Sequence, residues 1–103
     1  MTEHINASVR TRANVYFDGK CVSHSLELAD GSKKSVGVIL PSTLKFTTGA
    51  PEVMDVVDGV CRIRLSGSDS WAPYVAGQSF AVPGNSAFDI EVTQTVHYVC
   101  HFG

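Results

Sequence analysis

The last segment of the chain, residues 87–102, reads AFDIEVTQTVHYVCHF and determines the fold class that the sequence predicts. Apolar side chains occupy every second position in two runs, from Phe88 to Val92 and from Val96 to Phe102. This period of two is typical of a β-strand that buries one face. We therefore expect a pair of strands here, each with one buried side and one wetter side.

The same alternation continues back along the chain. Cys61, Ile63 and Leu65 alternate with Arg62 and Arg64, which indicates another half-buried strand. Glycines recur too often to leave room for a long amphipathic helix, and Asp-Gly, Ser-Gly and Pro-Gly pairs supply turn residues. About nine or ten short strands result, and an open sheet of that many strands would expose long edges. We therefore predict an all-β sandwich, jelly roll or small barrel.

Length and composition fit one globular domain. The chain has 103 residues, of which 44% are hydrophobic and 17% charged. Ten acidic and eight basic side chains give a formal net charge of -2, which argues against binding to duplex nucleic acid. We expect the domain to span residues 14–103 and residues 1–13 to form a loosely ordered arm or an edge strand.

The sequence also favours a reducing compartment. No apolar stretch approaches the roughly 20 residues that span a bilayer, and the N-terminus lacks the cationic start and apolar run of a signal peptide. Cys21, Cys61 and Cys100 are odd in number and far apart, which does not support a disulfide framework or a CxxC metal pair. A cytoplasmic protein with reduced thiols and no membrane partner is the expectation.

Two short motifs resemble those of the cupins. Residues 52–59, EVMDVVDG, have the acidic residue, six-residue spacer and glycine that end the first cupin motif. Residues 77–83, GQSFAVP, match the start of the second motif. The resemblance implies a single-domain, cupin-like double-stranded β-helix, a small jelly roll built around one cavity.

The metal ligands of the cupin motifs are absent from this sequence. Metal-binding cupins place two histidines before the glutamate and a third after the proline. Here Phe46 and Thr48 stand before Glu52, or Lys45 and Thr47 if the spacing is one residue longer, and Phe88 follows the proline. A lone carboxylate does not hold a transition metal tightly, so we expect no metal and no other cofactor.

A closer resemblance covers almost the whole chain. The sequence is similar to the small cupin-type pyrimidine/purine nucleoside phosphorylase family of bacteria in five stretches, namely residues 14–20, 35–38, 46–54, 77–88 and 98–100. This resemblance implies phosphorolysis of several nucleosides by inorganic phosphate, giving the free base and ribose 1-phosphate without a metal. Two positions depart from the family pattern, because Asn85 often reads as histidine and His101 as arginine.

Phosphorolysis needs a cradle for phosphate, stabilisation of a cationic ribosyl centre and a proton for the departing base. Glu52 stands where a cupin points its carboxylate into the cavity, and we expect it to be catalytic. The alternative is a strand carboxylate paired with a nearby Lys or Arg. Thr48 is the second catalytic candidate, and with Thr47 and the following backbone amides it would form an anion-binding concavity. Ordinary strand threonines are the competing interpretation.

Aromatic and turn residues supply the candidates for substrate binding. Phe46, Phe88 and Tyr98 occupy inward positions, where their faces would accept any nucleobase by stacking, or where they simply fill the core. Asn85 and Ser86 follow Pro83 and would offer polar groups at the cavity rim, or serve only the turn.

The remaining charged residues and the histidines are expected to lie outside the site. Lys20, Lys45, Arg62 and Arg64 could touch phosphate, but the strict alternation around the two arginines favours a solvated face. The four histidines do not converge on one ion.

The resemblance further implies a homodimer. A metal-free cupin that only binds a sugar or nucleotide is the alternative function, and a metal-dependent cupin enzyme is disfavoured.

Overall fold

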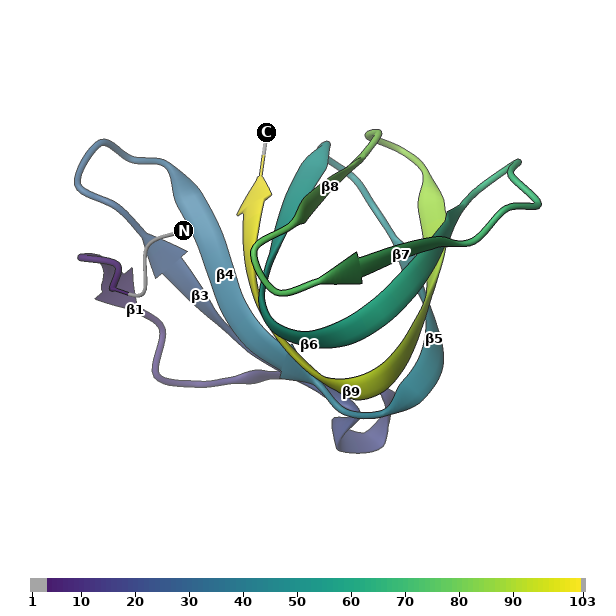
Figure 1. Cartoon of the computed structure of the whole chain (residues 1–103). Coiled ribbons are helices and arrows are strands. Elements are labelled where there is room, and N and C mark those ends of the chain that lie inside the picture. Colours follow the sequence, from purple (N-terminus) through teal and green to yellow (C-terminus); the bar gives the residue numbers. More distant parts are fainter. Residues whose placement is uncertain (1–3, 103) are drawn as a thin grey trace.

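The structure is a computed structural model that describes residues 4–102. It contains nine strands and one turn of 3-10 helix, and Figure 1 shows them wrapped into one small barrel-like body. In chain order these are β1 (Ser8–Val9), β2 (Asn14–Tyr16), η1 (Phe17–Gly19), β3 (Cys21–Glu27), β4 (Lys33–Ile39), β5 (Ser42–Thr47), β6 (Glu52–Leu65), β7 (Ala72–Val75), β8 (Ser79–Val82) and β9 (Ala87–Phe102).

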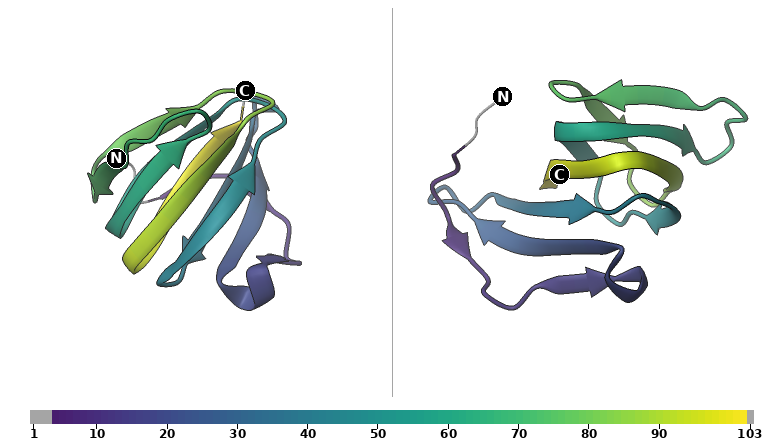
Figure 2. Two further views of the ribbon diagram at one scale, coloured as in Figure 1. Left: turned by 90° about the vertical axis from the view of Figure 1, so that its right-hand side faces the viewer. Right: turned by 60° about the horizontal axis from the view of Figure 1, so that its bottom comes forward.

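Two long strands, β6 and β9, organise the sheet. They pair antiparallel along their whole length, from Glu52 opposite Phe102 to Leu65 opposite Phe88. The first half of β9 pairs with β5 and the second half with β4, while the first half of β6 pairs with β8 and the second half with β7. Figure 2 shows β9 between β4 and β6 in both views. The two long strands therefore belong to both walls of the jelly roll, and the space between the walls is the interior.

The C-terminal segment differs from its prediction in one respect. The sequence indicated a pair of strands, whereas residues 87–102 form the single 16-residue strand β9. The apolar positions of both predicted runs are even-numbered, so the alternation never changes phase, and exposed Gln94 occupies the even position between them. Because the phase is kept, the strand bends across from one wall to the other without a turn.

The bend in β6 is marked by a glycine. The pairing of β6 with β9 shifts register between Val56 and Cys61, as at a β-bulge. Gly59 lies inside this stretch with a φ of +102°, and a Cβ at this position would stand 2.2 Å from the carbonyl oxygen of Thr95. Only glycine therefore allows the two backbones to approach so closely at the bend.

The core fills the space between the two walls with buried side chains from β3, β4, β6, β8 and β9. Its buried members include Met54, Val56, Phe80 and Ile90, each at most 5% exposed. The alternation of Cys61 and Ile63, both buried, with Arg62 is confirmed. These observations confirm the predicted all-β, cupin-like jelly roll.

The N-terminal segment 1–13 lies partly outside the described residues, which begin at residue 4. Within the described part, Ser8 and Val9 form β1, which pairs with Glu27 and Leu26 at the far edge of β3. Among residues 4–102 the structure contains no helix of the length and apolar character required to cross a membrane.

Candidate active site

One cavity opens between the two walls of the jelly roll. Its volume is about 240 Å³, and strands β2 to β6 and β9 all contribute to its lining. The lining residues are Tyr16, Ser23, Ser35, Ile39, Phe46, Thr47, Glu52, Met54, Phe88, Tyr98, Cys100 and Phe102. The lining of this one cavity therefore brings together five of the eight residues predicted for the site.

Glu52 begins β6 and lies half-buried in this lining. The thiol of Cys100 donates a hydrogen bond to Glu52 Oε1 across 3.5 Å. Burial raises the pKa of the Glu52 carboxyl, and the hydrogen bond from Cys100 offsets only part of that rise. The alternative expectation was a carboxylate paired with Lys or Arg. Among residues 4–102 the structure contains no ion pair of Glu52.

Cys100 stays a neutral thiol beside this carboxyl. It is 4% exposed, and burial together with the adjacent Glu52 raises its pKa to about 12. A thiol in this state donates a hydrogen bond and does not act as an anion. The pair therefore brings at most one negative charge into the cavity.

Small hydroxyl groups also contribute to the lining. Ser23 and Ser35 are buried on β3 and β4, and the Tyr98 hydroxyl lies 3.6 Å from the Cys21 sulfur. Burial raises the pKa of Tyr98 far above its usual range, so this hydroxyl remains neutral. Gly37 makes room for it, since a Cβ there would lie 2.9 Å from the Tyr98 oxygen.

Aromatic rings form the apolar part of the lining. The rings of Phe46 and Phe88 stack with centroids 5.5 Å apart and an interplanar angle of 22°. Phe17 packs edge-on against Phe46 at 5.3 Å, and Phe88 is only 3% exposed. Phe46 therefore presents a supported ring at the cavity, whereas Phe88 is mainly a buried partner that holds this ring in place.

Three of the predicted site residues lie outside the cavity lining. The Thr48 hydroxyl donates to the carbonyl of Pro83 across 2.7 Å and accepts from the N–H of Ser86 across 3.0 Å. The N–H of Asn85 donates to the carbonyl of Gly49, and Asn85 itself has a φ of +50°. These contacts join the β5–β6 loop to the β8–β9 turn. Their geometry favours a role in positioning the two loops, and a direct contact of Thr48 with substrate stays a prediction.

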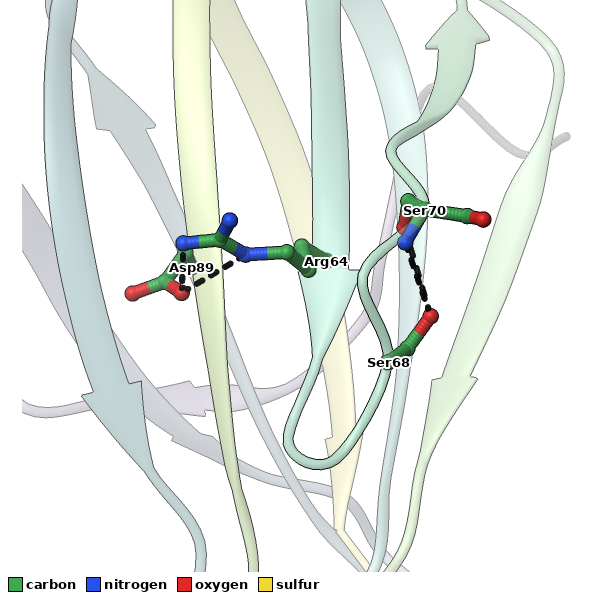
Figure 3. Close-up of polar contacts among 4 residues, drawn as sticks. All are labelled: Arg64, Ser68, Ser70 and Asp89. Atoms are coloured by element: carbon green, nitrogen blue, oxygen red, sulfur yellow. Dashed lines mark hydrogen bonds and ion pairs between the residues drawn. The ribbon is translucent and has the colours of Figure 1, made fainter.

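The two arginines of β6 face away from the cavity. Arg64 pairs with Asp89 of β9 across 3.1 Å, as Figure 3 shows, and Arg62 pairs with Glu91 across 2.9 Å. Both guanidinium groups also lie 4.7 Å from the centre of the Trp71 ring. This outer face is a set of ion pairs and cation–π contacts, as expected for a solvated strand face.

His101, one of the two positions that depart from the family pattern, also faces outward. Its Nε2 lies 2.6 Å from Asp55 Oδ2, and its Nδ1 lies 2.5 Å from Lys34 Nζ. Burial raises the pKa of Asp55, but hydrogen bonds from Ser79 and His101 outweigh this effect, so the pKa lies below its usual range. These residues tie four strands together on the side of β9 opposite Cys100.

The cavity lining carries little charge. Of its twelve residues, all within the described part of the chain, Glu52 is the one ordinarily ionised at neutral pH, and none is Lys, Arg or His. Residues 4–102 also contain no group of three or more His, Cys, Asp or Glu side chains arranged to hold a metal ion. Any anion bound in this cavity would rely on neutral hydrogen-bond donors.

Sequence reasoning missed several lining residues. Ser23, Ser35 and Cys100 are buried polar groups on strands, and nothing in a period-two pattern distinguishes a small polar residue facing a cavity from one facing solvent. Gly37 offered a partial signal, because a glycine within a strand marks a close approach of neighbouring groups.

Fold and cavity together define a cupin-type protein with a small, hydroxyl-lined interior site. Solved structures of low identity share this fold: a crystal structure of FeII HppE matches with a TM-score of 0.74 at 12% identity, covering 89% of this chain and 55% of the other. A structure of a protein of unknown function from Acinetobacter sp. ADP1 matches with a TM-score of 0.93 at 44% identity, covering 100% and 98% of the two chains.

Sequence comparison identifies the family. The family described as pyrimidine/purine nucleoside phosphorylase matches residues 11–102. Proteins with that name from Cupriavidus metallidurans and Laribacter hongkongensis are 62% and 65% identical over 103 residues, covering 100% of this chain and of each relative. The chain therefore belongs to the pyrimidine/purine nucleoside phosphorylase family, which confirms the resemblance seen in the sequence.

Proposed function

We infer that this protein is a nucleoside phosphorylase of broad specificity, a pentosyl glycosyltransferase. It converts purine and pyrimidine nucleosides and inorganic phosphate into free base and ribose 1-phosphate. One observation carries this inference: the family match spans residues 11–102, and every residue that lines the cavity lies within that range. The cavity is thus part of the region that the family shares.

The cavity offers a place for each part of the reaction. The Phe46 ring, supported by Phe88, accepts the base by stacking, which does not discriminate among nucleobases. Glu52 faces the ribosyl centre as the catalytic carboxyl, and the hydroxyls of Thr47 and Tyr98 are within the same lining and serve as hydrogen-bond partners for the substrate.

Residues of the adjoining loops complete the proposed site. Thr48, predicted as catalytic, acts in this proposal through the contacts by which it holds the β8–β9 turn. Asn85 and Ser86 lie on that turn and belong to the rim of the substrate site. Glu52 is therefore the first residue to vary, and the loop residues are second.

Phosphate binding in this proposal requires no metal. The lining supplies neutral donors such as Ser23 and Ser35, and no ligand set for a cation supplements them among the described residues. We propose that the enzyme uses inorganic phosphate as its co-substrate and needs no other cofactor.

The decisive experiment measures base release. Purified protein is incubated with uridine, inosine or adenosine, with and without phosphate, in the presence of EDTA. Release that depends on phosphate and survives EDTA is the expected result. Absence of release from all three nucleosides would contradict the proposal and leave a metal-free cupin that binds a sugar or nucleotide. Activity that EDTA abolishes would contradict the metal-free part alone.

We also propose that the protein acts in the cytoplasm as a homodimer. The outer face of β3, β4, β6 and β9 carries an apolar groove of about 750 Å³, lined by residues that include Val22, Val36, Val38, Val57 and Val99. None of the groove's lining residues is Asp, Glu, Lys or Arg. A two-fold contact would place this face against itself without like-charge repulsion, which favours a second copy as the occupant.

A further inference from the structure

Glu52 is the one ordinarily ionised side chain in the cavity lining, and its charge affects the binding of phosphate. Inorganic phosphate at neutral pH carries one or two negative charges, and the cavity lining contains no Lys, Arg or His to balance them. An ionised Glu52 would add a further negative charge within the same small space of about 240 Å³. Binding of phosphate is therefore favoured when the Glu52 carboxyl is protonated.

Phosphorolysis also requires one proton to change its position. When the bond between C1′ of the ribose and the base nitrogen breaks, its electron pair stays with the base, which needs a proton to leave as a neutral product. The attacking phosphate oxygen forms the new bond to C1′, and the hydrogen of HPO4²⁻ must leave for the product to be ribose 1-phosphate in its dianionic form. One proton is thus consumed at the base and one is released at the phosphate.

We propose that Glu52 carries this proton: its protonated carboxyl protonates the departing base, and the resulting carboxylate then takes the proton of the phosphate. The proposal rests on the nucleoside phosphorylase function inferred above. Its step is balanced, because the carboxyl is protonated again at the end and no further acid or base is required. Glu52 is ionised only while the ribosyl centre is cationic, so its negative charge stabilises that centre without opposing the binding of phosphate.

The groups that face Glu52 agree with this role. Cys100, from β9, donates its S–H to Oε1 and remains neutral. Burial also raises the pKa of Cys21 and of Tyr98, so these two groups bring no charge near the cavity. Desolvation by the surrounding strands raises the pKa of Glu52, so this carboxyl takes up a proton more readily than an exposed Glu when phosphate enters the cavity. Outward-facing Asp55, also on β6, has the opposite environment, with two hydrogen-bond donors.

The test compares two substrates that differ in their need for a proton. Inosine requires protonation of its leaving base, whereas N7-methylinosine carries a permanent positive charge on the base and leaves without an added proton. For Glu52→Gln we expect kcat/KM to fall by about a hundredfold or more on inosine, the usual range for a lost general acid, and by less than about tenfold on N7-methylinosine. Asp55→Asn, on the outer side of the same strand, is the matched control and should act on both substrates as the wild type does.

Equal losses on the two substrates would overturn the proposal, since a carboxyl that only positions the ribose serves both equally. Infrared spectroscopy supplies a readout independent of activity: the wild type with phosphate bound at neutral pH should show a protonated carboxylic acid carbonyl band that is absent from Glu52→Gln. An ionised Glu52 in a wild type that still phosphorolyses inosine would overturn the proton-transfer role and leave the phosphorylase function intact. Absence of phosphorolysis in the wild type would overturn both. Gln matches Glu in size and keeps the acceptor for Cys100, so the variant is expected to fold.

Discussion

Glu52 couples the stability of the fold to pH. Burial raises the pKa of its carboxyl above the ordinary value of 4.5, so the folded state binds the proton more tightly than the unfolded chain. The free energy of unfolding therefore falls as pH rises from that ordinary value through the raised one. Because Glu52→Gln has no carboxyl to ionise, its melting temperature at pH 7.5 should exceed that of the wild type.

Calorimetry over a range of pH checks this expectation. The difference between Glu52→Gln and the wild type should vanish near pH 3, where the carboxyl is protonated in both folded and unfolded chains. A variant that melts below the wild type at pH 7.5 would show that the ionised carboxylate stabilises the fold, contrary to its environment.

Thr48 is expected to matter first for stability. Thr48→Val keeps the shape of the side chain but leaves the Pro83 carbonyl and the Ser86 N–H without their partner, which should cost about 1–3 kcal/mol. Thr47→Val is the control, since Thr47 is exposed and the structure gives its hydroxyl no hydrogen bond, and it should change stability by less than about 0.5 kcal/mol. Chemical denaturation measures both. If the two variants unfold alike, Thr48 does not hold the loops together.

The long strands show what alternation predicts and what it cannot. The even-numbered apolar positions of β9 identify correctly which residues face inward, because side-chain direction depends only on local backbone geometry. Alternation contains no information on how far a strand extends before it changes partners. Residues 87–102 were therefore predicted as a pair of strands, although β5 and β4 pair with successive halves of one strand.

The bend of β6 depends on Gly59 for two reasons, its positive φ and its close approach to the backbone of β9. Gly77, which shares only the positive φ, allows the two effects to be measured separately. Gly59 and Gly77 both have positive φ, but a Cβ on Gly59 would collide with the Thr95 carbonyl, whereas a Cβ on Gly77 would meet nothing within 4 Å. Gly77→Ala should cost about 1–2 kcal/mol, the strain of a left-handed L-residue. Gly59→Ala should cost clearly more, because β6 and β9 must also separate. Equal losses in urea denaturation would show that the close approach is not needed.

For the molecule as a whole, the sequence predicted the architecture better than the site. Motif spacing around Glu52 and Pro83 indicated a jelly roll with an interior carboxyl, and the cavity contains that carboxyl. The neighbours of Glu52 in the lining were not predictable, because Cys100, its hydrogen-bond partner, and Ser35 reach the cavity from β9 and β4, far away in sequence. Contacts that depend on the pairing of distant strands have no local signal.

The last prediction follows from the proposed dimer and concerns the apolar groove on the outer face of β3, β4, β6 and β9. Val36 is partly exposed in the lining of the apolar groove, and Val36→Lys would place a charge against its own copy across a two-fold axis. Thr43 is exposed on β5 and does not line the groove, so Thr43→Lys adds the same charge away from the proposed contact. Sedimentation should show wild type and Thr43→Lys as dimers and Val36→Lys as a monomer, with a dimer dissociation constant at least tenfold weaker, or about 1.4 kcal/mol. A wild type that sediments as a monomer, or a Val36→Lys variant that stays dimeric, would mean that this face is not where two copies meet.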